Sequence, residues 1–344
     1  MDASIVIATC NRAGLLGRTL DSLATTRVGD GRRWEVVVVD NNSSDETSDI
    51  VRARMAAFPC SLRLVMERKQ GKSPALNTGI LVATGRLIVF TDDDVLIPPE
   101  WLAAGIEPLL ARSDIEYTGG PVRPLWEVDP PSWMAGDPGL LRGPIALVDY
   151  GPESFVFEER LRIPMGVNMA VRRSLIDRVG GFHLGLERRG NSLMGQGQAE
   201  FFCRTRAAGA RGLYVPEMWL SHHVPASRLT REYYRRWWFW KGVARAQMQD
   251  LHPITELGLD LRTVPKFLGM PRFMWGSTLR DAGAWLAAAI RGEEVRRAEA
   301  EMALVYFAGY LRTRRRISRG AHLDLDPVSL AEPSPGGSSV EAGP

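Results

Sequence analysis

The sequence contains few cysteines, and they lie far apart. Only Cys10, Cys60 and Cys203 occur among its 344 residues, and no pair has the C-x-x-C spacing. Neither a disulfide framework nor a zinc knuckle is therefore indicated. A reducing compartment is the simplest surrounding for such a chain, so we expect a cytoplasmic protein.

Long hydrophobic runs are also missing. No stretch reaches the roughly 18 consecutive apolar residues that a transmembrane helix needs. The N-terminal segment carries an acid at Asp2 and no basic residue before a short apolar run, so it does not resemble a signal peptide. The net charge of +3 is too small to indicate a nucleic-acid partner.

Two common nucleotide-binding motifs are absent as well. No G-x-G-x-x-G follows the first predicted strand, which argues against a dinucleotide site. The triplet Gly71-Lys72-Ser73 resembles the end of a P-loop, but Met66 stands where the first glycine is required. Lys72 could still contact an anionic substrate, or it could be a solvated loop lysine.

What the sequence does contain is a regular alternation of strand and helix patterns. Its 45% hydrophobic and 24% charged residues are typical of a folded soluble protein. Strands are predicted at residues 4–9, 34–39, 61–67 and 87–90, with helices at 15–23, 44–55 and 74–83 between them. This alternation predicts an α/β fold with a Rossmann-like, mostly parallel sheet flanked by helices.

Three consecutive acids follow the last of these strands. Asp92, Asp93 and Asp94 would stand at the carboxyl end of the strand, where open α/β sheets build their sites. Because side chains alternate along an extended segment, we expect Asp92 and Asp94 on one side and Asp93 on the other. Two carboxylates on one side suit Mg²⁺ or Mn²⁺. The alternative is that the acids only end the strand and begin a turn.

Polar residues also follow the first two predicted strands. Thr9 and Asn11 end the first, and Asp40 and Asn42 end the second. Because the carboxyl ends of parallel strands meet at one edge, these residues could line one pocket with the acids. They could bind a nucleotide base and ribose, or they could serve as turn and helix-cap residues.

Several segments resemble glycosyltransferase family 2, whose members have the GT-A fold. The resemblance covers residues 4–12, 36–45, 71–79 and the acid-bearing strand, and continues through 117–122, 165–173 and 179–182. It implies transfer of a sugar from a nucleoside-diphosphate sugar to an acceptor hydroxyl, with inversion and with Mg²⁺ or Mn²⁺. The family's usual donors are UDP- and GDP-sugars.

The resemblance also implies roles for individual residues. The donor would be bound by Thr9, Asn11, Arg12, Asp40, Asn42, Lys72, Asn77, Asp92 and Asp93. The metal would be held by Asp92 and Asp94, the Asp-x-Asp motif, with His222 as a further ligand. A lone histidine at a strand end would more commonly be structural. The acceptor would be bound by Gly166, Asn168, Gln198 and Trp237.

The expected catalytic base is missing from its usual position. The family places an acid where this chain has Gln198, and glutamine cannot accept a proton. Glu200 is the nearest carboxylate and becomes the candidate base. It could equally be a helix acid paired with Arg204 at i+4.

The composition changes after residue 225. Aromatic and basic residues alternate over 228–241, and about twice as many basic as acidic residues occur over 228–319. This pattern would suit binding to single-stranded nucleic acid, a helix at a membrane interface, or a wall on which sugars stack. We favour a helix that packs on the first domain and closes over the acceptor cleft. Short helices are predicted at 285–290 and 302–311. The basic region could touch the inner face of a membrane, which would suit a lipid-linked acceptor.

The predicted domains are a GT-A unit at 1–225, with a donor half at 1–115 and an acceptor half at 116–225, a helical extension at 226–320, and a disordered tail at 321–344.

A glycosyltransferase acting on a carbohydrate or lipid-linked acceptor is the leading hypothesis. A nucleotide-sugar or glycan-binding protein without catalysis is the alternative, favoured by Gln198. A nucleotidyltransferase, which would release pyrophosphate, ranks last.

Overall fold

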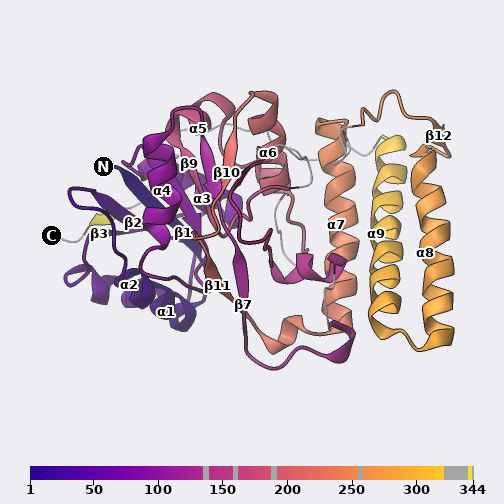
Figure 1. The fold of residues 1–344 in the computed structure, drawn as a ribbon, viewed down its shortest axis with the longest axis horizontal. Helices are drawn as coiled ribbons and strands as arrows, with labels where there is room; N and C mark the ends of the chain where they lie inside the picture. The colour runs from indigo at the N-terminus through magenta and orange to yellow at the C-terminus, as the bar shows by residue number, and fades with distance from the viewer. Residues whose placement is uncertain (135–138, 158–161, 187–191, 255–258, 321–339, 343–344) are drawn as a thin grey trace.

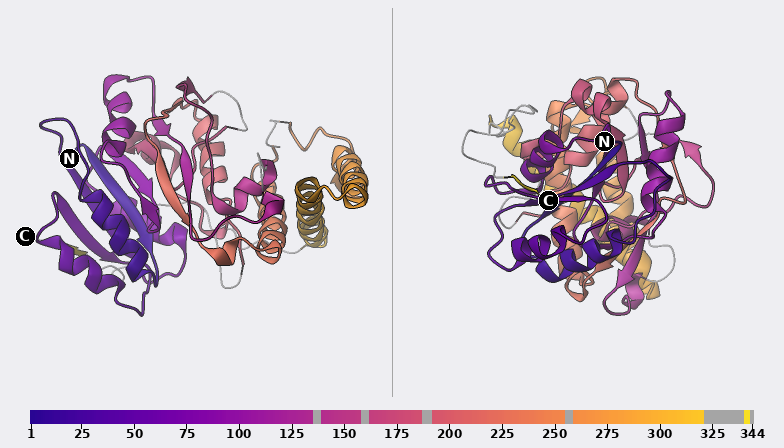
Figure 2. Two further views of the ribbon diagram at one scale, coloured as in Figure 1. Left: turned by 60° about the horizontal axis from the view of Figure 1, so that its bottom comes forward. Right: turned by 90° about the vertical axis from the view of Figure 1, so that its left-hand side faces the viewer.

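A sheet-containing part and a bundle of long helices lie side by side in the computed structural model (Figure 1). The structure describes residues 1–134, 139–157, 162–186, 192–254, 259–320 and 340–342. The views in Figure 2 show the bundle at one end of the molecule and the N-terminal strands at the other.

The large sheet is mostly parallel, as predicted. Its strands lie in the order β14-β3-β2-β1-β4-β9-β6-β10-β8. Parallel pairing joins β1 to β2 and β4, and β2 to β3, whereas β9 is antiparallel to both β4 and β6. The bounds are β1 (Ala3–Thr9), β2 (Trp34–Asp40), β3 (Ser61–Met66), β4 (Leu87–Thr91), β6 (Tyr117–Gly119), β8 (Phe155–Val156), β9 (Met169–Arg172), β10 (Gly212–Tyr214) and β14 (Val340–Ala342).

Helices cover both faces of this sheet because its strands are apolar on both sides. Ile5 and Ile7 of β1 belong to the core under one face, whereas Val6 belongs to the core under the other. The first face carries α1 (Ala13–Leu23), α2 (Thr47–Met55) and α4 (Trp101–Ala111), and the second carries α3 (Lys72–Val82), α5 (Arg173–Val179) and α6 (Gly197–Ala207). Gly79 lets α3 approach closely, since a Cβ there would lie 2.4 Å from Val6 Cγ1.

A second, three-stranded sheet lies beyond the end of β4. It has the order β5-β11-β7, with β5 (Val95–Leu96), β11 (Leu220–Val224) and β7 (Val122–Trp126). β11 pairs with β5 in antiparallel fashion, which places His222 opposite Val95. This pairing brings residue 222 next to the acids, which precede β5 directly.

The helices of the extension are longer than the sequence pattern predicted. The helix expected at 285–290 is the C-terminal end of α8 (Arg272–Arg291), and the helix expected at 302–311 is the apolar centre of α9 (Glu294–Ser318); both follow α7 (Arg231–Leu251). The turns that flank the centre of α9 are rich in Arg and Glu, which are good helix formers but carry no apolar periodicity. Of the helices that the structure describes, none is long and apolar enough to span a membrane.

Glycines join α7 closely to α9, and α9 lies between α7 and α8 (Figure 1). A Cβ at Gly242 would lie 2.1 Å from the Tyr306 carbonyl oxygen, and one at Gly309 would lie 2.1 Å from that of Phe239. Short 3-10 turns η1 (Ser132–Met134) and η2 (Gly139–Ile145) contribute to the same core. The extension is therefore packed onto the α/β part.

The chain's last residues lie largely outside the described part. Residues 321–339 and 343–344, where disorder was predicted, are not described, whereas β14 pairs antiparallel with β3. For these three residues the structure differs from the predicted disorder. The predicted boundary at residue 225 falls between β11 and α7.

Candidate functional site

A cavity of about 570 Å³ lies at the carboxyl ends of β1 and β4. It is closed by the start of α3, by β11, by the loop after η2 and by α7. The side chains from the first half that line it include Thr9, Cys10, Arg12, Asn41, Gln70, Lys72, Asp92, Asp93 and Asp94. Those from the second half include Pro144, Met165, Leu193, Met194, Gln198, His222, Arg228 and Trp237.

All three acids face this cavity, which corrects the predicted alternation. β4 ends at Thr91, and the chain bends at Asp93 and Asp94 instead of remaining extended. The expectation that Asp93 points away from its neighbours is therefore wrong. Asp93 and Asp94 are almost fully buried, and both contact one arginine.

Two basic side chains balance the acids. Arg12 Nη1 lies 3.1 Å from Asp93 Oδ1 and 2.6 Å from Asp94 Oδ2. Lys72 Nζ lies 2.6 Å from Asp92 Oδ1, and the Thr9 hydroxyl donates to Asp93 Oδ2 at 2.7 Å. The sequence assigned Arg12 and Lys72 to the donor. In the structure, the carboxylates are their partners.

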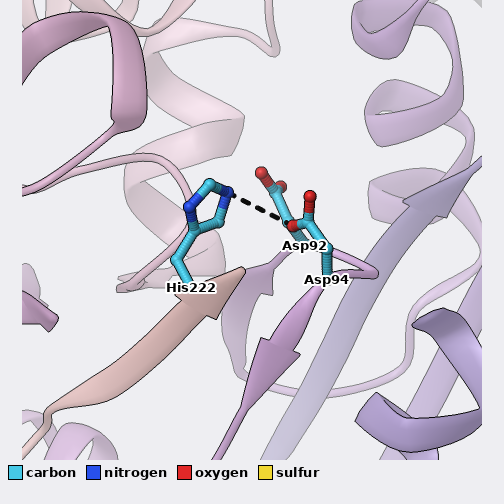
Figure 3. A group of neighbouring side chains, drawn as sticks. All are labelled: Asp92, Asp94 and His222. Carbon is cyan, nitrogen blue, oxygen red and sulfur yellow. Dashed lines mark ion pairs between the residues drawn. The ribbon is translucent and has the colours of Figure 1, made fainter. Parts of the chain in front are cut away.

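His222 completes a group that could hold a divalent cation. One ligand atom from each of Asp92, Asp94 and His222 lies within 4.8 Å of the others, and the three side chains point toward one another (Figure 3). His222 Nε2 is 3.3 Å from Asp94 Oδ1. Among the described residues, neither Asp94 Oδ1 nor His222 Nδ1 has a hydrogen-bond partner, although both are buried. Two carboxylates and an imidazole with an unsatisfied buried oxygen are a donor set that fits Mn²⁺ or Mg²⁺.

The surroundings separate the two buried acids. Burial raises the pKa of Asp93 to about 6, although the Arg12 charge acts to lower it. Burial acts in the same direction on Asp94, but His222, Arg12 and Arg228 outweigh it and hold the pKa of that carboxyl well below its usual range. Asp94 is therefore ionised at neutral pH, as a metal ligand must be.

The polar residues that end β2 make local bonds. Asp40 accepts hydrogen bonds from the Ser43 amide at 2.9 Å and from the Ser48 hydroxyl at 2.5 Å. Asn42 donates to the Arg68 carbonyl oxygen at 2.6 Å. Neither residue lines the cavity wall described above. Asp40 makes the turn contact that the sequence left open as the alternative, whereas Asn42 joins the loop after β2 to the segment after β3.

Asn11 lies at the end of β1 with φ of 53°, a left-handed conformation that asparagine tolerates. Its side-chain oxygen accepts from the Ser44 amide at 2.7 Å. It joins the β1 and β2 loops but does not line the cavity.

Two other predicted site residues hold the fold from inside. The Asn77 amide pairs with both backbone groups of Phe182, at 2.9 and 2.8 Å. The Asn168 oxygen accepts from Trp101 Nε1 at 2.7 Å, and its amide nitrogen donates to the Pro121 carbonyl oxygen at 2.9 Å. Neither side chain lines the cavity. With its bonds made inside the fold, Asn168 has little capacity left for a sugar.

Three of the residues assigned to the acceptor do lie together in the cavity wall. The Gly166 amide donates to Gln198 Oε1 at 2.7 Å, and a Cβ at Gly166 would approach that oxygen to 2.9 Å. Trp237 reaches the same cavity from α7. Met165 and Met194 line the cavity too and add apolar surface to it.

Glu200, the candidate base, is buried away from the cavity. Arg204 donates to both of its oxygens at 2.8 Å, and His252 Nε2 lies 2.9 Å from Oε1. Burial would raise the pKa of Glu200, but His252 and Arg204 outweigh it and lower the pKa below its ordinary value. This is the i+4 pairing that the sequence allowed as the alternative. Among the described residues that line the cavity, the only carboxylates are Asp92, Asp93 and Asp94.

Sequence reasoning missed several cavity residues, among them two polar ones, Asn41 and Arg228. Asn41 donates to the carbonyl oxygens of Glu67 and Lys69 at 2.8 and 2.9 Å and accepts from the Gly71 amide at 2.7 Å, which shapes the loop before α3. Its position between Asp40 and Asn42 was the available signal. Arg228, just after β11, had no signal beyond its charge.

Comparisons with known proteins agree with this architecture. A sequence profile of glycosyl transferase family 2 matches residues 4–180. Glycosyltransferase AglE of Haloferax volcanii is 30% identical over 119 residues, which are 35% of this chain and 38% of that protein. A PGL/p-HBAD biosynthesis glycosyltransferase of Mycobacterium bovis is 41% identical over 103 residues, 29% of this chain and 38% of that protein. The matched stretches thus span less than half of either relative.

A solved structure shares the fold. The mannosyltransferase PcManGT from Pyrobaculum calidifontis, in complex with GDP-Man and Mn²⁺, superposes with a TM-score of 0.56 at 22% identity. The superposition covers 90% of this chain and 86% of that one. The predicted GT-A architecture is confirmed. The chain belongs to glycosyl transferase family 2.

Proposed function

We propose that the protein transfers a sugar from a nucleoside-diphosphate sugar to an acceptor hydroxyl, with inversion and with a divalent metal. The observation that carries the proposal is the group of Asp92, Asp94 and His222, facing a cavity that also holds Arg12, Lys72 and Arg228. An ion held by the first three would neutralise charge on the leaving diphosphate. The Mn²⁺ complex of the P. calidifontis enzyme supports this choice of ion.

The donor would lie across the ends of β1 and β4. Arg12 and Lys72 pair with the acids, and their guanidinium and ammonium groups are suited to phosphate oxygens. Thr9, Cys10 and Asn41 line the side next to β2 and would face the nucleoside. Asp40 would act indirectly, because its carboxylate accepts hydrogen bonds from the Ser43 amide and the Ser48 hydroxyl in the segment after β2.

The acceptor would enter from the side of α7. Trp237 offers an aromatic face against which a sugar ring could stack. Gln198 accepts from the Gly166 amide and donates to the Pro164 carbonyl oxygen; its remaining hydrogen-bonding capacity could orient a hydroxyl but cannot deprotonate it. The apolar wall of Met165 and Met194 favours a carbohydrate acceptor that carries an apolar group, such as a lipid-linked one.

A second candidate function rests on the same glutamine. Because Gln198 stands in the family's base position and Glu200 is buried in ion pairs, the chain could bind a nucleotide sugar without turning it over. Calorimetry that detects donor binding, together with no hydrolysis or transfer on any acceptor, would favour this function.

The test is incubation with a panel of UDP- and GDP-sugars and Mn²⁺, with analysis of the released nucleotide. We expect nucleoside diphosphate, which chelator and Asp94→Asn each abolish. Asp114→Asn is the matched control, because Asp114 is exposed and pairs with surface arginines. Release of pyrophosphate would indicate a nucleotidyltransferase. Transfer that survives both chelation and Asp94→Asn would refute the role of the metal.

A further inference from the structure

The outermost helix of the molecule presents large apolar side chains to solvent. Leu279, Leu286 and Ile290 of α8 are 74%, 57% and 78% exposed. The hairpin before α8, made of β12 (Lys266–Phe267) and β13 (Met270–Pro271), exposes Phe267 and Leu268 at its tip, at 57% and 67%. We call Phe267, Leu268, Leu279, Leu286 and Ile290 the apolar ridge.

The helical members of the ridge share one side of α8. Leu279, Leu286 and Ile290 are spaced by seven and four residues, so they line a single stripe. Ala288 is the buried residue of α8, and it lies on the opposite side of the helix. α8 packs on α9 at the end of the molecule farthest from the sheet, as Figures 1 and 2 show. The ridge therefore faces away from the rest of the protein.

Basic side chains border the ridge. Lys266, Arg272 and Arg280 are exposed, and none of them forms an ion pair within 4 Å among the described residues. Arg291 instead lines the cleft between α8 and α9. Of the nearby acids, Asp260 is paired with Arg262, and Asp281, which interacts electrostatically with Arg280, lines that cleft. Apolar residues with a cationic border match the two components of an anionic lipid surface, its acyl region and its headgroups.

We propose that α8 and the preceding hairpin bind anionic membranes, with the apolar ridge inserted at the headgroup level and the helix lying in the plane of the surface. A second copy of the chain is the less suitable occupant, because pairing two α8 helices along the ridge would bring copies of the basic border, Arg272 and Arg280, close together. The proposal stands apart from the transferase activity, since no ridge residue lines the catalytic cavity.

The experiment is cosedimentation of the full chain with vesicles, in the absence of any nucleotide sugar. We expect binding to mixed phosphatidylcholine and phosphatidylserine vesicles, little binding to phosphatidylcholine alone, and a decrease with added salt. A triple variant, Leu279→Ser, Leu286→Ser and Ile290→Ser, should bind at least about tenfold more weakly. A double variant, Arg272→Gln and Arg280→Gln, should lose roughly tenfold on anionic vesicles only.

Val128→Ser is the matched control, because Val128 is 47% exposed but lies between β7 and η1, far along the chain from the ridge. It should bind like the parent. Thermal unfolding of each variant separates misfolding from lost binding. Equal vesicle binding by the triple variant and the parent would overturn the proposal. So would a parent that ignores anionic vesicles but forms dimers that the triple variant does not, because the ridge would then join two copies.

Discussion

Arg12 is the residue whose replacement tests the metal site most directly. Its guanidinium contacts both Asp93 and Asp94, which are about 95% buried, and its own side chain is 34% exposed. A divalent ion on Asp94 Oδ1 would compete with Arg12 for the charge of one carboxylate, because Arg12 holds its other oxygen, Oδ2. We therefore expect Arg12→Met to affect stability and metal affinity in opposite directions.

The magnitude follows from the contacts. Breaking a buried ion pair costs about 3–5 kcal/mol, and solvent screening of a side chain that is one-third exposed reduces this to roughly 2–3 kcal/mol. Removing a competing charged hydrogen bond of about 1.5–3 kcal/mol should tighten Mn²⁺ binding by roughly 10- to 100-fold. At the concentration that half-saturates the parent, Mn²⁺ would add about 0.4 kcal/mol to its stability and about 1.4 kcal/mol or more to that of the variant.

The assays are denaturant unfolding with chelator and with Mn²⁺, and calorimetric titration with Mn²⁺. Arg54→Met is the matched control, because Arg54 pairs with Asp21, an acid whose side chain is 64% exposed. It should change stability by less than about 1 kcal/mol and leave Mn²⁺ binding unaltered. If Arg12→Met leaves Mn²⁺ affinity unchanged or weaker, the reasoning that Arg12 competes with the ion is refuted.

Three further predictions concern parts outside the metal site. The pKa of Glu200 is lowered in the folded protein. The ionised carboxylate therefore stabilises the fold above its ordinary pKa of 4.5, and this stabilisation is lost as the pH falls through the lower folded pKa. Glu200→Gln should be less stable than the parent at pH 7 by about 2–4 kcal/mol, and acid unfolding curves should show this difference shrinking. If Glu200→Gln instead keeps its stability but loses turnover, Glu200 is the base after all. Partial burial raises the pKa of Cys60 to about 12, so mass spectrometry should find it modified only slowly by iodoacetamide at pH 8, and prompt alkylation of the folded protein would contradict the raised pKa. Gly309→Ala places a Cβ 2.1 Å from the Phe239 carbonyl oxygen and should destabilise the protein by more than about 2 kcal/mol in thermal unfolding. Gly283→Ala has open space around it and should stabilise the protein by up to about 1 kcal/mol. Equal melting temperatures of the two variants would refute the close approach of α7 and α9.

Much of the fold follows from local patterns in the sequence. The first four strands and the helices between them have clear patterns, so their succession along the chain is predictable. The same patterns predict that the ends of β1 and β4, with Thr9 and Asp92, lie at one edge of the sheet. His222 needed the pairing of β11 with β5, which joins segments more than a hundred residues apart. Only the family resemblance placed it beside the acids in advance.

The orientation of polar side chains was much harder to predict. Asn77 and Asn168 occur in motifs typical of the family, but each is buried because its partners come from distant segments. Asp93 faces the cavity because the chain bends after Thr91, and periodicity does not report such a bend. A single sequence indicates where polar residues gather but does not reveal which backbone groups will satisfy them.

The place of Trp237 has a consequence for how the protein is made. One wall of the cavity comes from α7, which leaves the ribosome well after the acids of the β4 edge. Because domains fold as they are synthesised, the N-terminal sheet can form while its pocket still lacks Arg228 and Trp237. A nascent chain that stops at residue 225 would therefore display the acids in a pocket that lacks one wall, and the cavity would be complete only once α7 has docked.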